Sequence, residues 1–149
     1  MVASVGKAAR SVGLPAGDVE AVDRVHELAM QPRVELLADD HHPAYLHPGR
    51  TALILLQDVG AVDVSVVILG LLQEATDSKL RPPATQIADA LGGEASLNAL
   101  TAIPKPGDER LVERLVVLGP GSALAALAER LDHLRHLHMR PDLIDTWAD

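Results

Sequence analysis

The chain has 149 residues, of which 48% are hydrophobic but only 1% aromatic, and it contains neither phenylalanine nor cysteine. This length suits one domain, and a core built from Leu, Val, Ile and Ala favours an all-α fold because Ala and Leu are strong helix formers. The formal charge of −8 argues against nucleic-acid binding, and the lack of cysteine excludes disulfides and thiolate metal sites. No apolar run approaches the roughly 18 residues of a membrane span, and no signal peptide is visible, so we expect no membrane partner and a cytoplasmic location.

The N-terminal part is predicted to hold a loose arm followed by a helix. Residues 1–17 mix small residues with glycine and proline, so we expect a flexible arm there and a single domain over residues 18–149. Asp18 can cap a helix that continues to about residue 30, with its valines and leucine on one face.

The next segment is predicted to be a loop and a second helix. Residues 32–46 are dense in charge and histidine, so we expect there either a loop or a helix end followed by a loop. Pro48 suits the first turn of a helix, where its missing N–H costs nothing. That helix is expected to run to about Asp58 and to stop at Gly60.

The most apolar stretch follows, and it is predicted to be the central helix. Asp63 precedes residues 64–75, which are apolar nearly all round, a pattern typical of a helix buried on every side. A run of β-branched residues can also form a strand, but no partner strand is evident elsewhere. We therefore expect no β-sheet, and residues 64–75 as the most buried helix.

Four further helices are expected in the C-terminal half. Gly92 and Gly119 supply stop signals, and Ser122 is a candidate cap for the last long helix. The expected ranges are 85–91, 95–102, 108–118 and 123–139. Trp147 is predicted to anchor the C-terminus on the bundle or at a dimer contact.

Three short motifs occur in a fixed order. They are His47-Pro48, then Leu-Leu-Gln-Glu-Ala-Thr-Asp at residues 71–77, then Leu-Ala-Glu-Arg-Leu-Asp-His-Leu-Arg at residues 127–135. Together with the stretch at residues 99–105, this order resembles the HD-domain phosphohydrolases, in particular the alarmone hydrolases of the Rel/Spo type. The resemblance implies a bundle of about seven helices.

The resemblance also implies a metal site and the residues that would form it. In the family, a His-Pro histidine, a His-Asp pair and a distal Asp bind a metal that activates a water molecule. The matching positions here are His47, Gln73, Glu74 and Glu129, with Glu74 and Asp77 as candidate catalytic carboxylates. A site with so many oxygen ligands would suit Mn²⁺ or Mg²⁺.

Several of these positions depart from the family pattern. Gln73 replaces an imidazole with a weak neutral ligand, Glu74 and Glu129 are each one methylene longer than Asp, and Ser78 stands where a second catalytic carboxylate is usual. The acidic pair at residues 39–40 lies where relatives carry a basic residue. We therefore expect metal binding to be weak or absent.

Three functions remain open. The leading hypothesis is a degenerate relative of (p)ppGpp or nucleotide phosphohydrolases whose activity is weak, altered or lost. One alternative is an active Mn²⁺- or Mg²⁺-dependent phosphohydrolase with a carboxylate-rich site, acting on a nucleotide or another phosphoester. The other is a non-catalytic regulatory or protein-binding module, and a homodimer is compatible with each.

Two histidine-rich stretches are best explained without a metal. His133, His136 and His138 are expected on a solvated helix face, and His41 and His42 in a solvated loop beside Asp39 and Asp40.

Overall fold

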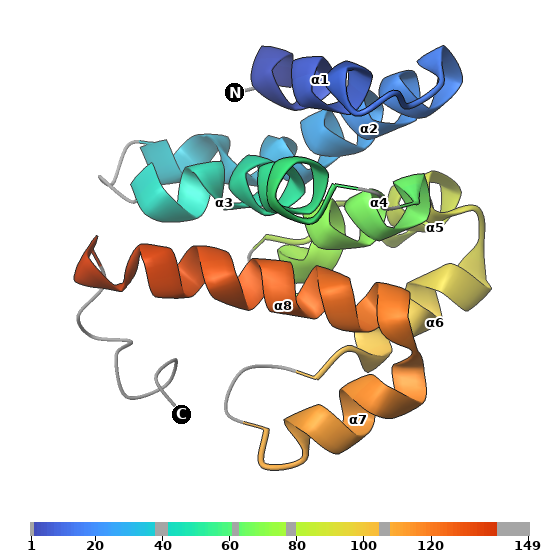
Figure 1. Ribbon diagram of the computed structural model, residues 1–149, viewed down its shortest axis with the longest axis vertical. Coiled ribbons are helices and arrows are strands. Elements are labelled where there is room, and N and C mark those ends of the chain that lie inside the picture. Colours follow the sequence, from blue (N-terminus) through green and yellow to red (C-terminus); the bar gives the residue numbers. More distant parts are fainter. Residues whose placement is uncertain (1, 38–41, 61–62, 77–79, 105–107, 140–149) are drawn as a thin grey trace.

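A computed structural model describes residues 2–37, 42–60, 63–76, 80–104 and 108–139, and this part of the chain is helical without a strand. The all-α prediction is confirmed, and none of these helices is long and apolar enough to cross a membrane. The described residues form eight α-helices, which are labelled in Figure 1. Their bounds are α1 Val2–Ser11, α2 Ala16–Met30, α3 His42–Leu53, α4 Val64–Leu72, α5 Ala84–Leu91, α6 Glu94–Ala102, α7 Leu111–Leu118 and α8 Pro120–Arg135.

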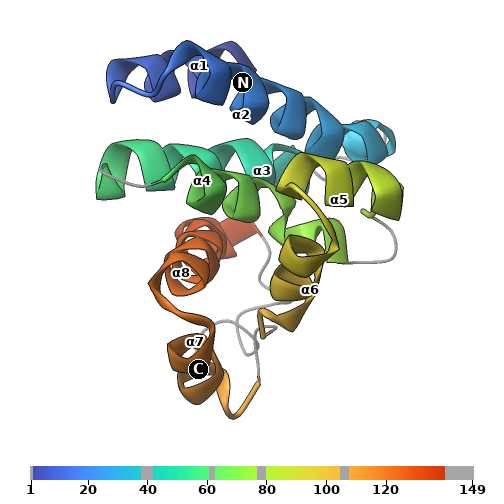
Figure 2. The same ribbon diagram turned by 90° about the vertical axis from the view of Figure 1, so that its right-hand side faces the viewer.

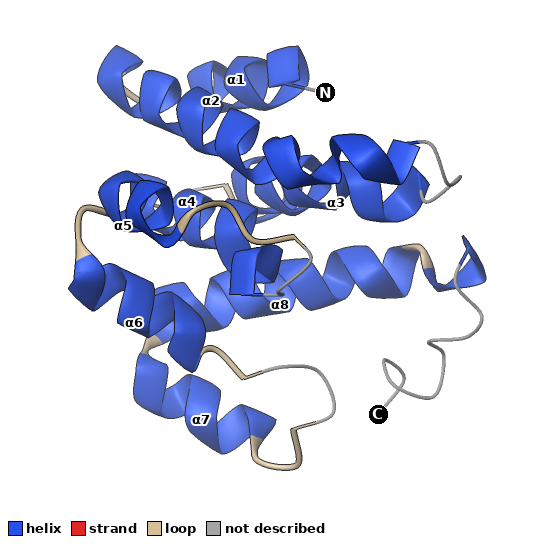
Figure 3. Cartoon of the chain, turned by 180° about the vertical axis from the view of Figure 1, so that it is seen from behind, coloured by secondary structure: helices blue, strands red, loops and turns tan. Residues whose placement is uncertain are grey.

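The helices form layers around α3 and α4. The pair α1 and α2 covers one side of α3 and α4, and α8 crosses the opposite side (Figures 1 and 2). Helix α5 packs on α4 and α6, and α7 lies beyond α8 towards the end of the molecule (Figure 3). Both α3 and α8 therefore contact α4, and the candidate site forms where these elements meet.

Helix α4 is the buried centre of the bundle, as its apolar sequence predicts. Six of its nine residues are buried, and Gly70 lets it approach α3 closely. A Cβ added at Gly70 would lie 2.6 Å from Cδ1 of Leu55 and 3.3 Å from Cγ2 of Thr51. The α-helix ends at Leu72, and a 3₁₀ turn over Gln73–Thr76 continues it, so the helical segment reaches the predicted end.

The N-terminal arm predicted for residues 1–17 is wrong for most of its length. Helix α1 occupies Val2–Ser11 and packs on α2. Val5, Ala8 and Ala9 are buried, and their spacing of three and four residues places them on one helical face. The small residues that suggested a loose arm permit close packing of two helices, and Gly13, with φ of 85°, makes the turn between them.

Several helix starts also differ from the prediction. Helix α2 begins at Ala16, so Asp18 lies within its first turn and is no cap. Helix α3 begins at His42, inside the predicted loop, because Pro43 takes the early position that the prediction gave to Pro48. Pro48 lies inside α3 and is buried. A π-helical turn over Ile54–Val59 then ends the segment at Gly60, which has φ of 88°, as predicted.

The last long helix likewise starts before its predicted cap. Helix α8 begins at Pro120, with Gly119 as the preceding residue at φ of 90°, so Ser122 lies within the first turn and is no cap. Proline suits the first helical position because that position needs no N–H donor. The helix ends at Arg135, and a short 3₁₀ turn over Leu137–Met139 follows. Trp147 lies outside the described residues.

Candidate metal centre

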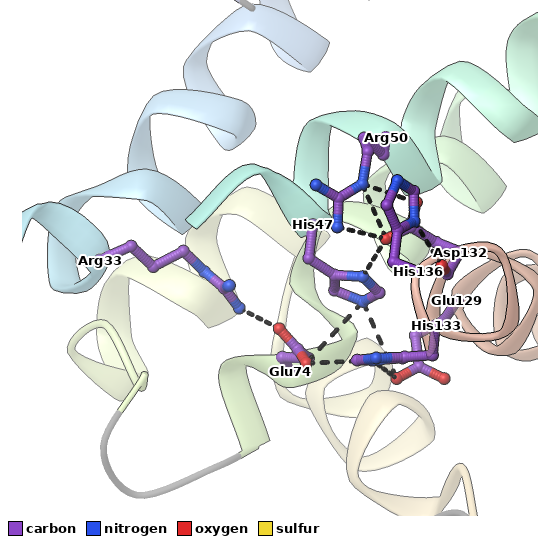
Figure 4. A network of polar contacts seen from close by, with 8 residues as sticks. All are labelled: Arg33, His47, Arg50, Glu74, Glu129, Asp132, His133 and His136. Carbon is purple, nitrogen blue, oxygen red and sulfur yellow. Dashed lines mark hydrogen bonds and ion pairs between the residues drawn. The ribbon is translucent and has the colours of Figure 1, made fainter. Parts of the chain in front are cut away.

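Four side chains from three segments of the chain meet at one point beside α8. They are His47 from α3, Glu74 from the turn that ends α4, and Glu129 and His133 from α8 (Figure 4). One ligand atom from each residue can be chosen so that all four atoms lie within 4.8 Å of one another. The group could therefore share a single metal ion.

Local structure explains how these residues come together. Glu129 and His133 are four residues apart on α8, so both project from the same helix face. Glu74 follows directly on the buried helix α4, whose packing against α8 presents the carboxylate to that face. His47 enters from α3, which packs on both α4 and α8.

The ring of His133 lies between the two glutamates. Its Nε2 is 3.1 Å from Oε1 of Glu129 and 3.3 Å from Oε1 of Glu74. Burial alone would lower the pKa of His133, but the two carboxylates outweigh burial and raise this pKa to about 9. Burial would likewise raise the pKa of Glu74, but His47, His133 and Arg33 together hold it well below its ordinary value. Without a metal, the charge on the imidazole of His133 thus balances part of the carboxylate charge.

His47 presents one ring nitrogen to the cluster. The residue is 2% exposed, and its Nδ1 lies 2.7 Å from Oδ2 of Asp132. Its Nε2 is buried with no hydrogen-bond partner, and it lies 3.8 Å from Oε1 of Glu74 and 3.8 Å from Oε1 of Glu129. A buried nitrogen without a partner carries a desolvation cost, which a metal ion at this point would offset.

Two arginines hold the carboxylates around the cluster. Arg33, itself only 2% exposed, forms an ion pair with Oε2 of Glu74, so that Oε1 faces the histidines (Figure 4). Arg50 donates to both carboxylate oxygens of Asp132. Burial would raise the pKa of Asp132, but His47 and Arg50 lower it to about 2.

The structure brings together three of the four residues expected to bind metal. They are His47, Glu74 and Glu129. The fourth, Gln73, lines a cavity of about 20 Å³ together with Glu129. Asp77, the other candidate catalytic carboxylate, lies outside the described residues.

The expectation of a solvated histidine face on α8 is wrong for His133. This residue is half-buried inside the cluster, because α8 turns its Glu129–His133 face towards α3 and α4. His136 packs back on its own helix, with Nδ1 2.7 Å from the backbone oxygen of Asp132. His138 alone of the three is exposed.

Sequence reasoning also missed Asp132, Arg33 and Arg50. One signal was available for His133, since its spacing of four residues from Glu129 places both on one face of a helix. No comparable signal exists for Asp132 or the arginines, because their partners lie in distant segments.

The donor set suits a divalent transition-metal ion. Two imidazoles and two carboxylates provide four ligands, and two carboxylates match the charge of a divalent cation. The expectation of weak binding rested on the loss of one imidazole and on the longer side chains of Glu74 and Glu129, and His133 supplies the imidazole that Gln73 lacks.

Comparison of the chain with family models, curated proteins and solved structures finds no match.

Proposed function

We propose that this chain is a metal-dependent phosphoester hydrolase that binds one divalent transition-metal ion through His47, Glu74, Glu129 and His133. The observation that carries the proposal is the convergence of these four buried or half-buried side chains on one point. The Nε2 of His47, buried there without a hydrogen-bond partner, adds independent support because native structures rarely leave such an atom unmatched.

The ligand set favours Mn²⁺ over Mg²⁺. Mg²⁺ prefers oxygen ligands and gives up its water reluctantly, whereas imidazole nitrogen suits transition metals. A bound ion of this kind acts as a Lewis acid and lowers the pKa of a bound water towards neutrality. The chain's own part is to hold Oε1 of Glu74 towards the centre through Arg33, and to keep the site largely closed to bulk water.

The proposed substrate carries less negative charge than an alarmone. The resemblance to Rel/Spo-type hydrolases suggests (p)ppGpp, but a substrate with several phosphates needs cations to hold them. Arg33 and Arg50, the two arginines that hold the carboxylates around the cluster, are already engaged with Glu74 and Asp132. A simple phosphodiester or phosphomonoester places a smaller demand on basic groups.

Metal binding is the first test. Protein purified without chelator would be analysed for metals, then stripped with EDTA and titrated with MnCl₂ by calorimetry. We expect about one Mn²⁺ per chain, and loss of binding in Glu129→Gln. Glu113→Gln is the matched control, because it removes the same charge from a side chain that is 69% exposed on α7.

Hydrolysis is the second test. The Mn²⁺-loaded protein would be assayed with bis(p-nitrophenyl) phosphate and p-nitrophenyl phosphate, beside the Glu129→Gln variant. Turnover that depends on both the metal and Glu129 supports the proposal. Stoichiometric metal without turnover would leave a metal site but refute the hydrolase, and absence of binding would refute both.

A further inference from the structure

Asp132 lies beside the proposed metal site but is not one of the four proposed ligands. The residue is 1% exposed and lies on α8, between Glu129 and His133. Its Oδ2 is 2.7 Å from Nδ1 of His47. Arg50 reaches the same carboxylate through Nε, at 2.7 Å from Oδ1 and 3.0 Å from Oδ2, and through a terminal nitrogen at 2.8 Å from Oδ2.

One carboxylate therefore connects two residues of α3 to α8. His47 and Arg50 are three residues apart and lie on the same face of α3, so Asp132 meets both at once (Figure 4). The backbone oxygen of Asp132 accepts a hydrogen bond from Nδ1 of His136 at 2.7 Å, and the same nitrogen lies 3.3 Å from Oδ1 of Asp132. These contacts leave the carboxylate little freedom to turn away from His47.

The contact with Asp132 decides which nitrogen of His47 carries the proton. An ionised carboxylate can only accept hydrogen bonds, so Nδ1 of His47 must be the donor. In the neutral ring, which is the form that binds a metal, the lone pair then lies on Nε2. This atom faces Glu74 and Glu129 and has no hydrogen-bond partner. With the opposite tautomer, two lone pairs would face each other at Asp132 and an N–H would block the metal position.

We propose that Asp132, held by Arg50, is a positioning residue that fixes His47 in the Nδ1–H tautomer, so that Nε2 is the atom that binds the metal. This inference rests on the proposed metal site. Carboxylates that accept from a metal-bound histidine orient the ring and raise its basicity, and their loss commonly weakens metal binding about 10- to 100-fold.

The affinity test uses Asp132→Asn. An asparagine amide can donate to Nδ1 and so stabilise the wrong tautomer, and we expect Mn²⁺ affinity, measured by calorimetry on stripped protein, to fall about 10- to 100-fold. Asp58→Asn is the matched control, because Asp58 forms an exposed ion pair with Arg135 at 2.8 Å. This control should keep wild-type affinity.

A second variant covers the case in which Asp132→Asn does not fold, as judged by circular dichroism. Arg50→Gln leaves the carboxylate in place but removes its anchor, and it should weaken Mn²⁺ binding by a smaller factor than Asp132→Asn. Unchanged affinity in a folded Asp132→Asn, or in Arg50→Gln if only that variant folds, would overturn the inference while the metal site itself stands.

A spectroscopic measurement separates positioning from a merely structural role. In ¹⁵N-labelled protein loaded with diamagnetic Zn²⁺, histidine correlation spectra report which ring nitrogen is protonated. We expect a protonated, slowly exchanging Nδ1 at His47 and metal attachment through Nε2. Attachment through Nδ1 would overturn the inference, and failure of the wild-type chain to bind any metal would remove it together with the proposed function.

Discussion

His26 offers a test of the fold that does not depend on the metal site. The residue lies on α2 and is fully buried, and neither of its ring nitrogens has a hydrogen-bond partner. Burial penalises the charged imidazolium and lowers the pKa of His26 from 6.5 to about 4. The folded protein thus holds a neutral histidine in its core, and acid should destabilise it.

The sign and size of the effect follow from the two pKa values. Between pH 6.5 and about 4, the unfolded chain binds a proton at His26 that the folded chain does not, so stability falls as the pH falls. The loss is about 2 kcal/mol at pH 5 and about 3 kcal/mol at pH 4, relative to neutral pH. Since a domain is commonly stable by about 5–15 kcal/mol, this change is large enough to measure.

Urea unfolding of metal-stripped wild type and His26→Leu at pH 7, 5 and 4 measures this change. The difference in unfolding free energy between the two proteins should shift by about 2 kcal/mol, in favour of the variant, between pH 7 and pH 5. Other titrating groups are common to both proteins and cancel. His138→Leu removes an exposed histidine and should leave the pH dependence unchanged. A difference that stays flat across this range would refute the argument from burial.

Three further outcomes are expected. Mn²⁺ at about 100 times its Kd should stabilise the stripped protein by about 2.7 kcal/mol, or about 5–10 °C in Tm, and Glu129→Gln should abolish this shift in a thermal melt. Gly70→Ala should lower the free energy of unfolding, measured in urea, by about 1–2 kcal/mol, because the steric cost of the new methyl against Leu55 exceeds the gain in helix propensity. Gly17→Ala, where a Cβ has nothing within 4 Å, should be neutral or stabilising. The Mn²⁺-loaded protein should release pyrophosphate from (p)ppGpp far more slowly than about 1 s⁻¹, and a rate at that level would contradict the proposed substrate class.

Local sequence was enough to predict most of the helices and most of their ends. Residues 64–75 are apolar all round, and the structure places them at the centre of the bundle. Gly60 and Gly92 end their helices as predicted, because each adopts a positive φ that favours glycine. Helix α1 was missed because small residues with glycine and proline suggested a loose arm, and the start of α3 at His42 was missed because charge and histidine suggested a loop.

The sequence predicted only those residues of the candidate site that match the family motifs. Order and spacing pointed to His47, Glu74 and Glu129, and the structure brings these three together. The family resemblance placed the second imidazole at residue 73, where this chain has Gln, and His133 was expected on a solvated helix face. Which face α8 turns inward depends on its packing against α3 and α4, and this packing is not encoded in the spacing along α8 alone.

Tertiary structure alone decided the polar partners of the site. His47 and Asp132 are 85 residues apart in the chain, and Arg33 and Glu74 are 41 residues apart. Amphipathic periodicity predicts which residues of a helix are buried, but it does not predict which residues of another helix they contact. The sequence by itself thus determined an all-α bundle and pointed to three of the four clustered residues, whereas helix packing added His133 to the cluster and placed Asp132 against His47.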